Sequence, residues 1–178
     1  PTLYQFFRHQ VSHGFLAHGL SEPTVVDYIS DILSRFAETR ALYALQDNGG
    51  RPLEYIVDML EEWLRAQGSS EGGTASPSRE RFVMRHLGEY TLFMSGLFRE
   101  RLKKRGELNY YLAHGRSAYW RCADHESHPP RRQLYWRLHH DFGRISNTLD
   151  HMRHGQFPLT APSCSAGRRN TSARADAA

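Results

Sequence analysis

The residues best suited to chemistry in this sequence are basic and aromatic side chains that recur at four-residue steps in its second half. Four-residue spacing places side chains on one face of a helix. If two such helices lie antiparallel, their tryptophans and guanidinium groups meet around a groove that fits an anionic ligand or an acidic peptide. The alternative is that both tryptophans fill a second helix interface. The candidate binding residues are Arg116, Trp120, Arg132, Trp136, His140 and Arg144.

Histidine is abundant enough to test for metal binding, since the chain has 11 histidines. His9 and His13 are four apart, and His151 and His154 are three apart, so each pair could share a helix face. A di-iron bundle would need Glu-x-x-His motifs, yet no glutamate is followed three residues later by histidine. Neither His-Glu-x-x-His nor paired Cys-x-x-Cys occurs. We therefore expect no metal and no cofactor, with the histidines acting as surface or interhelical hydrogen-bonding groups.

The common catalytic motifs are also missing. The sequence contains no Gly-x-Ser-x-Gly elbow, no phosphate-binding Gly-x-x-x-x-Gly-Lys loop and no Gly-x-Gly-x-x-Gly turn. Cys122 falls on the apolar face of an expected helix, which favours a small core residue over a nucleophile. We expect a protein that is not an enzyme.

Charge is unevenly distributed along the chain, which has a formal net charge of +4. Residues 1–67 are acidic overall, and the remainder is basic. A run of cations lies beside two tyrosines, a mixture that phosphate and base contacts would use; its members are Arg99, Arg101, Lys103, Lys104, Arg105, Tyr110 and Tyr111. Cations at a helix carboxyl end also complement the helix dipole. Nucleic-acid binding is therefore an alternative rather than the main prediction.

Apolar periodicity predicts an all-α helical bundle of about six helices. The longest, 78–105, carries an apolar stripe at alternating spacings of three and four and should form the centre of the bundle. Gly19 and Gly106 are natural helix stops. The other expected helices span about 2–18, 24–45 (or from 21), 52–67, 107–126 and 130–155.

Composition predicts one helical domain, 1–157, followed by a disordered tail, 158–178, rich in Ser, Ala, Arg and Gly. Within the domain, a Gly- and Ser-rich flexible linker, 68–77, separates an acidic half, 1–67, from a basic half, 78–157. Each half has only three expected helices, so we expect the halves to share one core.

Location and partners follow from what the sequence lacks. It has no apolar run of membrane-spanning length and no basic segment followed by an apolar one near residue 1, so we expect neither a membrane span nor a secretory signal. Two cysteines are too few for a disulfide framework, which favours the cytoplasm. We expect a non-catalytic interaction or regulatory module that binds a protein partner. A basic nucleic-acid-binding protein and a sensor of a small anionic ligand are the alternatives, and the oligomeric state stays open.

Overall fold

The computed structural model describes residues 2–38, 41, 43–68 and 74–155, and in these ranges the chain is all-α. This confirms the predicted fold class. The β-type pairing in the described residues is an isolated antiparallel bridge between Gln46 and Pro52. The tail expected at 158–178 and the middle of the expected linker, 69–73, lie outside the described residues. The helices are α1 (Leu3–Ala17), α2 (Pro23–Phe36), α4 (Ile56–Ala66), α5 (Pro77–Leu97), α6 (Arg99–Lys104), α7 (Leu108–His125), α8 (Pro129–His140) and α9 (Phe142–Gly155).

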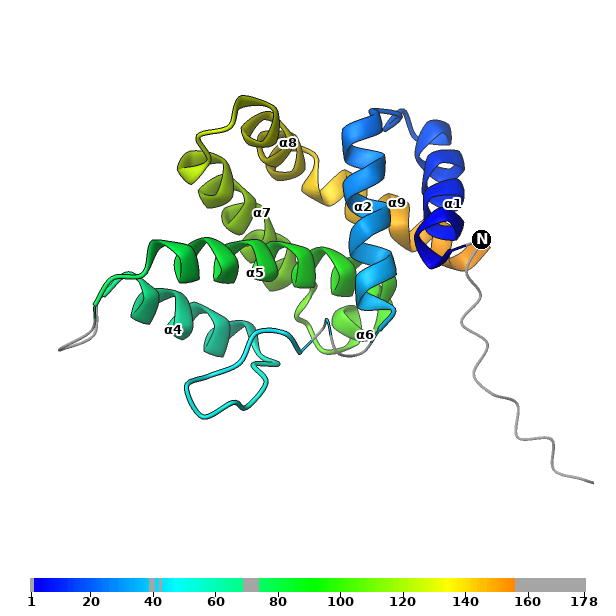
Figure 1. Ribbon diagram of the computed structural model, residues 1–178. Helices are drawn as coiled ribbons and strands as arrows, with labels where there is room; N and C mark the ends of the chain where they lie inside the picture. The colour runs from blue at the N-terminus through cyan, green and yellow to red at the C-terminus, as the bar shows by residue number, and fades with distance from the viewer. Residues whose placement is uncertain (1, 39–40, 42, 69–73, 156–178) are drawn as a thin grey trace, which may run out of the picture.

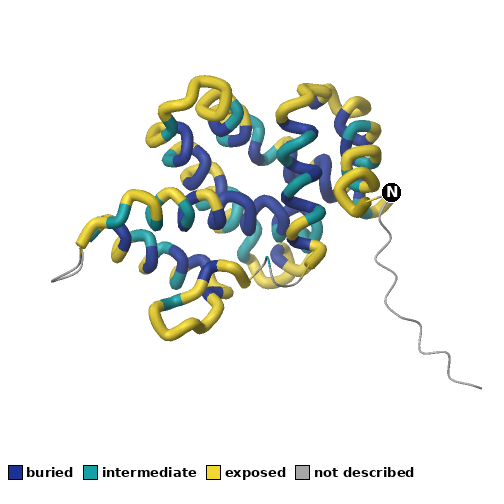
Figure 2. Tube along the Cα trace, viewed as in Figure 1, coloured by how far each residue is buried: buried dark blue, intermediate teal, exposed yellow. Residues whose placement is uncertain are grey.

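Helix α5 is the centre of the bundle, as the apolar stripe predicts. It packs against α4 on one side and against α7 and α9 on another, and α2 crosses its second half (Figure 1). Every residue from His86 to Phe93 is buried, so this stretch of α5 is covered on all sides (Figure 2). A helix buried all round must carry small or apolar residues on every face, and it must satisfy any polar group it buries.

Two glycines set the close packing of α5 against α7. A Cβ on Gly88 of α5 would lie 2.9 Å from Cζ of Tyr119 on α7. A Cβ on Gly115 of α7 would lie 2.6 Å from the Thr91 hydroxyl oxygen of α5 and would overlap the Phe142 ring. These two contacts also show that the helices run antiparallel, so the first half of α5 faces the last half of α7.

Two of the expected helices are interrupted. The long helix expected at 78–105 breaks at Phe98, whose φ of −119° ends α5 before α6 begins. The helix expected at 130–155 breaks at Asp141, where Arg137 Nε donates to the aspartate at 2.7 Å. Neither break falls on a glycine or a proline, although Gly96 and Gly143 each lie two residues away. Each break turns the next helix so that its apolar residues, such as Leu102 and Phe142, become buried.

The segment between α2 and α4 also differs from its predicted structure. Helix α2 ends at Phe36 instead of continuing to residue 45, and α4 begins at Ile56 rather than at residue 52. A turn follows residue 46, in which Asp47 Oδ1 accepts the backbone N–H groups of Gly49 and Arg51 at 2.8 and 2.9 Å. Leu45 and Leu53 on either side of this turn are buried, and the Leu53 backbone N–H donates to the Leu45 carbonyl at 2.9 Å.

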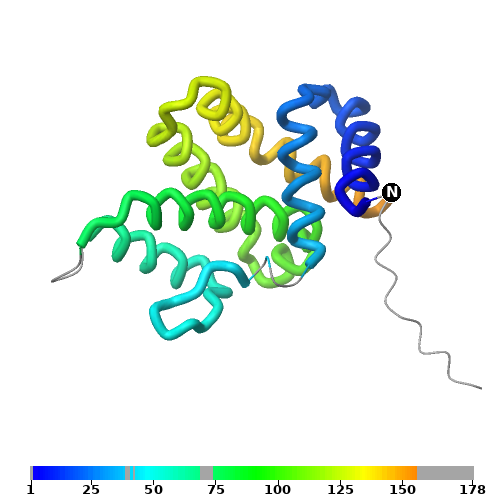
Figure 3. Tube along the Cα trace, in the orientation of Figure 1, coloured from blue at the N-terminus to red at the C-terminus, as the bar shows by residue number. Residues whose placement is uncertain are grey.

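The two halves of the chain contribute to one hydrophobic cluster. It includes Val11 and Ile29 from the acidic half together with Leu87 and Leu149 from the basic half. An ion pair of opposite sign also links the halves, with Arg79 Nε 3.0 Å from the buried Glu62. The end of α9 lies beside the beginning of α1, so the two ends of the described chain are neighbours (Figure 3). Within the described ranges, none of the helices combines the length and the apolar character needed to cross a membrane.

Candidate functional site: an arginine-lined cleft

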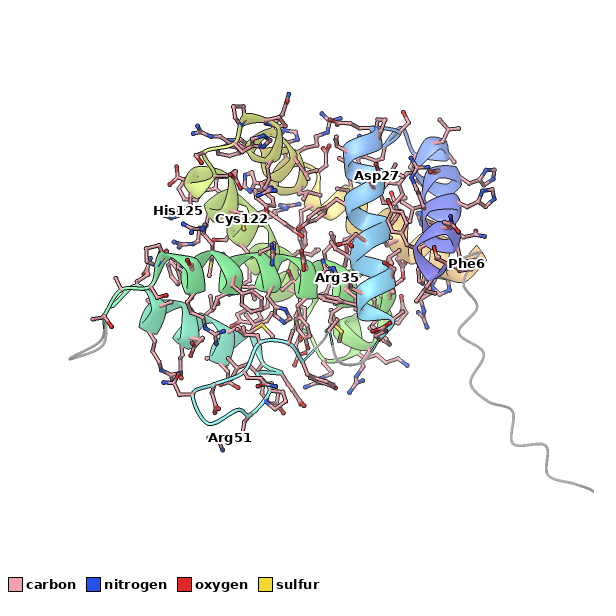
Figure 4. The ribbon with its side chains drawn as sticks, in the orientation of Figure 1. Phe6, Asp27, Arg35, Arg51, Cys122 and His125 are labelled. Carbon is pink, nitrogen blue, oxygen red and sulfur yellow. The ribbon has the colours of Figure 1, made fainter. Side chains whose placement is uncertain are left out.

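The antiparallel pairing of α5 and α7 leaves a cleft where the two helices diverge. The cleft has a volume of about 550 Å³ and lies between the first half of α5, the last half of α7 and the start of α8. Cys122 and His125, on the α7 side of this cleft, are labelled above α5 in Figure 4. Guanidinium groups line it from all three helices; we call it the arginine cleft and define it by Arg81, Arg85, Arg121 and Arg131.

The cleft arginines lack the close carboxylate partners found elsewhere in the fold. Arg85 Nε is 3.9 Å from Glu89, and Arg131 Nη1 is 3.7 Å from Glu126. Among the described residues, neither Arg81 nor Arg121 has a hydrogen-bond partner or a carboxylate oxygen within 4.0 Å.

Several arginines outside the cleft have closer carboxylate partners. Arg8 is 2.8 Å from Asp27, and Arg137 is 2.7 Å from Asp141. Close, charge-assisted hydrogen bonds of this kind neutralise a guanidinium group and occupy part of its five-donor capacity. The cleft guanidinium groups therefore keep donors available for a ligand.

The two acidic residues of the cleft are already engaged by neighbouring donors. Glu80 Oε1 accepts from the Trp63 indole at 3.2 Å and from the Gln67 amide at 3.0 Å. Glu126 Oε1 accepts the backbone N–H of His128 at 3.0 Å. Arg121 lies over the Trp63 ring, 4.0 Å from its centroid, so a cation–π contact holds this guanidinium group in place.

A buried polar network lies behind the cleft. Glu89 on α5 is 3% exposed and accepts from the Tyr28 hydroxyl at 2.9 Å. Arg35 extends from α2, and its Nη2 atom lies 3.0 Å from the other carboxylate oxygen of Glu89. Figure 4 labels Arg35 where α2 crosses α5. The Tyr119 hydroxyl lies 3.3 Å from that of Tyr28. Burial raises the pKa of both tyrosines well above the usual range, so both stay protonated and hydrogen-bond within the network.

The cleft holds no activated nucleophile among its thiol and phenol groups. Burial, reinforced by the negative charge of Glu89, raises the pKa of Cys122 to about 12. Burial likewise raises the pKa of Tyr135 to about 12. Both groups are therefore neutral at physiological pH, and Cys122 is a small buried residue as its position on the apolar face predicts. In the part of the chain that the structure describes, no three His, Cys, Asp or Glu side chains are placed to share a metal ion.

Of the six residues that the sequence singles out, the structure brings Trp120 and Trp136 together. Their ring centroids are 6.4 Å apart in an edge-to-face arrangement. The side chains are 42% and 39% exposed, so they form a surface pair rather than filling an interface within the fold. Glu22 shares the hollow beside Trp136 with Arg137, His139 and His140, and Arg137 Nε lies 3.5 Å from the Glu22 carboxylate.

Of the other four members of that set, His140 lines the hollow beside Trp136, whereas Arg116, Arg132 and Arg144 do not. Arg144 Nη2 donates to the His18 carbonyl of α1 at 2.6 Å, because the break at Asp141 turns α9 away from the line of α8. Arg116 packs against Gly143, where a Cβ would lie 2.7 Å from Nη2. His140 and Arg132 are exposed.

The arginine cleft itself is missing from the sequence prediction. Arg81 and Arg85 are four apart on the expected central helix, which is a visible signal. The sequence does not show that Arg121 and Arg131 face them, because that depends on the antiparallel pairing at Gly88 and Gly115.

Comparison with known proteins gives no relative for this chain: no family model matches it, and neither does any curated protein or solved structure. Functional inference therefore depends on the geometry of the site.

Proposed function

We propose that this chain is a non-catalytic sensor that binds a small, multiply charged anion in the arginine cleft. The observation that supports it is the convergence of four guanidinium groups from three helices, none with a carboxylate closer than 3.7 Å. A volume of about 550 Å³ falls in the range typical of small-molecule sites. Such a cleft fits a ligand with two anionic groups, such as a diphosphate or a phosphorylated sugar.

The cleft arginines have different roles in this proposal. Arg121 is fixed by its stacking on Trp63 and presents one edge of its guanidinium group to the ligand. Arg85 lies between the ligand and the buried Glu89, whose charge draws the guanidinium group inward. Arg81 and Arg131 lie at the edge of the cleft and close around a second anionic group. Planar guanidinium forks bind phosphate and carboxylate oxygens in pairs, which gives selectivity for ligands with two such groups.

The proposal includes no catalytic step. Both the thiol and the phenol on the floor of the cleft are neutral at physiological pH, as shown above. A ligand held by cations without an activated nucleophile is bound and released unchanged. The network of Glu89, Arg35 and Tyr28 connects the cleft to α2. We therefore expect a ligand bound at Arg85 to affect the contacts between α5 and α2.

Thermal shift with a panel of anions tests this proposal. Pyrophosphate and citrate should raise the melting temperature of the parent protein, since a ligand that binds only the native state stabilises it, and acetate should not. The Arg131→Ala variant should lose most of this shift, because a hydrogen bond between charged groups contributes about 1.5–3 kcal/mol. Arg132→Ala is the matched control: it removes the neighbouring exposed arginine, which does not line the cleft.

Two results would contradict the proposal. One is the absence of any shift with the divalent and trivalent anions. The other is an equal loss in Arg131→Ala and Arg132→Ala, which would mean that net charge rather than the cleft governs binding.

A second candidate function, binding of an acidic protein segment, is supported by the exposed Trp120 and Trp136 pair. Exposed tryptophans are rare and are enriched among the residues that dominate protein interfaces. A fluorescently labelled acidic peptide should bind the parent protein and lose affinity in Trp136→Ala. The control variant, Tyr4→Ala, removes an exposed aromatic residue of α1. Unchanged binding in Trp136→Ala would rule out the tryptophan pair as the contact.

A further inference from the structure

A second hollow lies on a different part of the molecule and shares no lining residue with the arginine cleft. It has a volume of about 470 Å³ and lies between the loop before α4, the second half of α5 and the connection from α6 to α7. Five tyrosines line it, and we call it the tyrosine pocket; they are Tyr43, Tyr55, Tyr90, Tyr110 and Tyr111.

The inner wall of the tyrosine pocket is fixed by two of these rings. Tyr90 and Tyr111 have centroids 6.3 Å apart and planes inclined by 33°. The Tyr90 hydroxyl donates to the Glu54 carbonyl at 3.1 Å, which ties α5 to the loop before α4. The wall therefore exists before any ligand arrives.

The rim of the pocket presents aromatic rings to solvent. Tyr55 is 63% exposed and Tyr110 is 44% exposed. The edge of Tyr110 is supported by His114, whose ring centroid is 4.3 Å away. Exposed aromatic faces beside an apolar wall favour stacking of a planar ring, and such stacking tolerates any base.

One cation of the pocket is available for an anionic group. Arg105 is paired with Glu107 at 3.2 Å. The guanidinium group of Arg101, which also lines the pocket, has no hydrogen-bond partner and no carboxylate oxygen within 4.0 Å among the described residues. Two acidic residues, Glu54 and Glu107, also line the pocket, and Glu107 is the ion-pair partner of Arg105. The hollow thus combines aromatic faces with one available guanidinium group.

We propose that the tyrosine pocket binds a nucleotide unit, with the base on the tyrosine rings and the phosphate on Arg101. The same chemistry occurs in a free mononucleotide and in one nucleotide of a single strand, so both sources fit the pocket. This site is independent of the proposed function, because it uses neither the helix faces nor the arginines of the arginine cleft.

Calorimetric titration of the full chain with adenosine monophosphate tests this proposal, with adenosine and inorganic phosphate as partial ligands. We expect the mononucleotide to bind at one site, and each partial ligand to bind at least about tenfold more weakly, because stacking and the charged contact each contribute. A labelled oligoadenylate, followed by anisotropy at two salt concentrations, distinguishes the sources. Tight binding that weakens steeply with salt assigns the pocket to a single strand, whereas equal affinity per nucleotide assigns it to the free ligand.

Two matched pairs of variants locate the binding. Tyr110→Leu should weaken it at least about fivefold, whereas Tyr110→Phe should keep it, because phenylalanine retains the aromatic face. Arg101→Ala should weaken it, whereas Lys104→Ala, which removes an exposed cation of the same helix outside the pocket, should not. Thermal melts of all four variants show whether each is folded.

Several outcomes would overturn this proposal. Failure of both the mononucleotide and the oligoadenylate to bind at millimolar concentration is one. A second is an equal loss of nucleotide affinity in Tyr110→Leu and Tyr110→Phe, or in Arg101→Ala and Lys104→Ala. Loss in Arg121→Ala but not in Arg101→Ala would assign the nucleotide to the arginine cleft, so failure of this proposal is distinguishable from failure of the proposed function.

Discussion

His86 should make the stability of this protein strongly dependent on pH. It lies on α5 with 4% of its surface exposed, and its ring stacks between Phe82 and Tyr90 at centroid distances of 6.2 and 6.1 Å. Its Nε2 atom is buried and has no hydrogen-bond partner among the described residues. Burial, together with the positive charges of Arg35, Arg85 and Arg79, lowers the pKa of His86 to about 4. The native state therefore keeps this imidazole neutral.

The magnitude of the effect follows from proton linkage. An unfolded histidine has a pKa of about 6.5, so below that pH the unfolded state binds a proton that the native state excludes. Protonation of His86 in the unfolded state does not reduce the free energy of unfolding well above pH 6.5. That free energy then decreases as the pH falls from 6.5 toward 4. Between pH 7 and pH 5 the loss is about 2 kcal/mol.

Urea unfolding at pH 7 and at pH 5 measures this loss. The parent protein should lose more stability between the two conditions than His86→Phe, by about 2 kcal/mol. His13→Phe, which removes an exposed histidine of α1, should lose as much as the parent. An equal pH dependence in the parent and in His86→Phe would refute the reasoning, because His86 would then be protonated in the native state or neutral in both.

Three further predictions concern the packing of the fold. Gly115→Ala should destabilise the protein by about 1–3 kcal/mol in urea unfolding, because a methyl group would overlap Phe142 and the Thr91 hydroxyl, and a gain in stability would contradict this. Glu89→Gln should cost about 2 kcal/mol, because Tyr28 and Arg35 lose a charged acceptor, and a change below about 0.5 kcal/mol would show that the network is not stabilising. Proteolytic cleavage within 69–73 should leave the two halves associated on a sizing column, whereas separation into independently folded halves would contradict the single hydrophobic cluster.

Much of the fold could be predicted from the sequence because helix periodicity and helix stops are local signals. Gly19 and Gly106 end helices with φ values of 70° and 68°, as glycine at a helix end predicts. The breaks at Phe98 and Asp141 have no such signal, because they arise from the packing of the residues that follow them. The end of α2 at Phe36 is likewise not marked by a glycine or a proline in the sequence.

The candidate site was less predictable, because its parts come from three helices. Trp120 and Trp136 were expected to meet if their two helices lay antiparallel, and the structure pairs them. Extending the same spacing from His140 to Arg144 failed, because the helix does not continue through Asp141. The cleft depends on the register of α5 against α7, which is set by contacts at Gly88 and Gly115. The sequence of either helix alone does not determine this register.

The most direct test of the arginine cleft is a crystal structure of this chain grown with pyrophosphate. Ligand density should lie between α5 and α7, with phosphate oxygens within hydrogen-bond distance of Arg85 and Arg121. Density beside Trp120 and Trp136, or a cleft that stays empty while pyrophosphate binds in solution, would contradict this prediction.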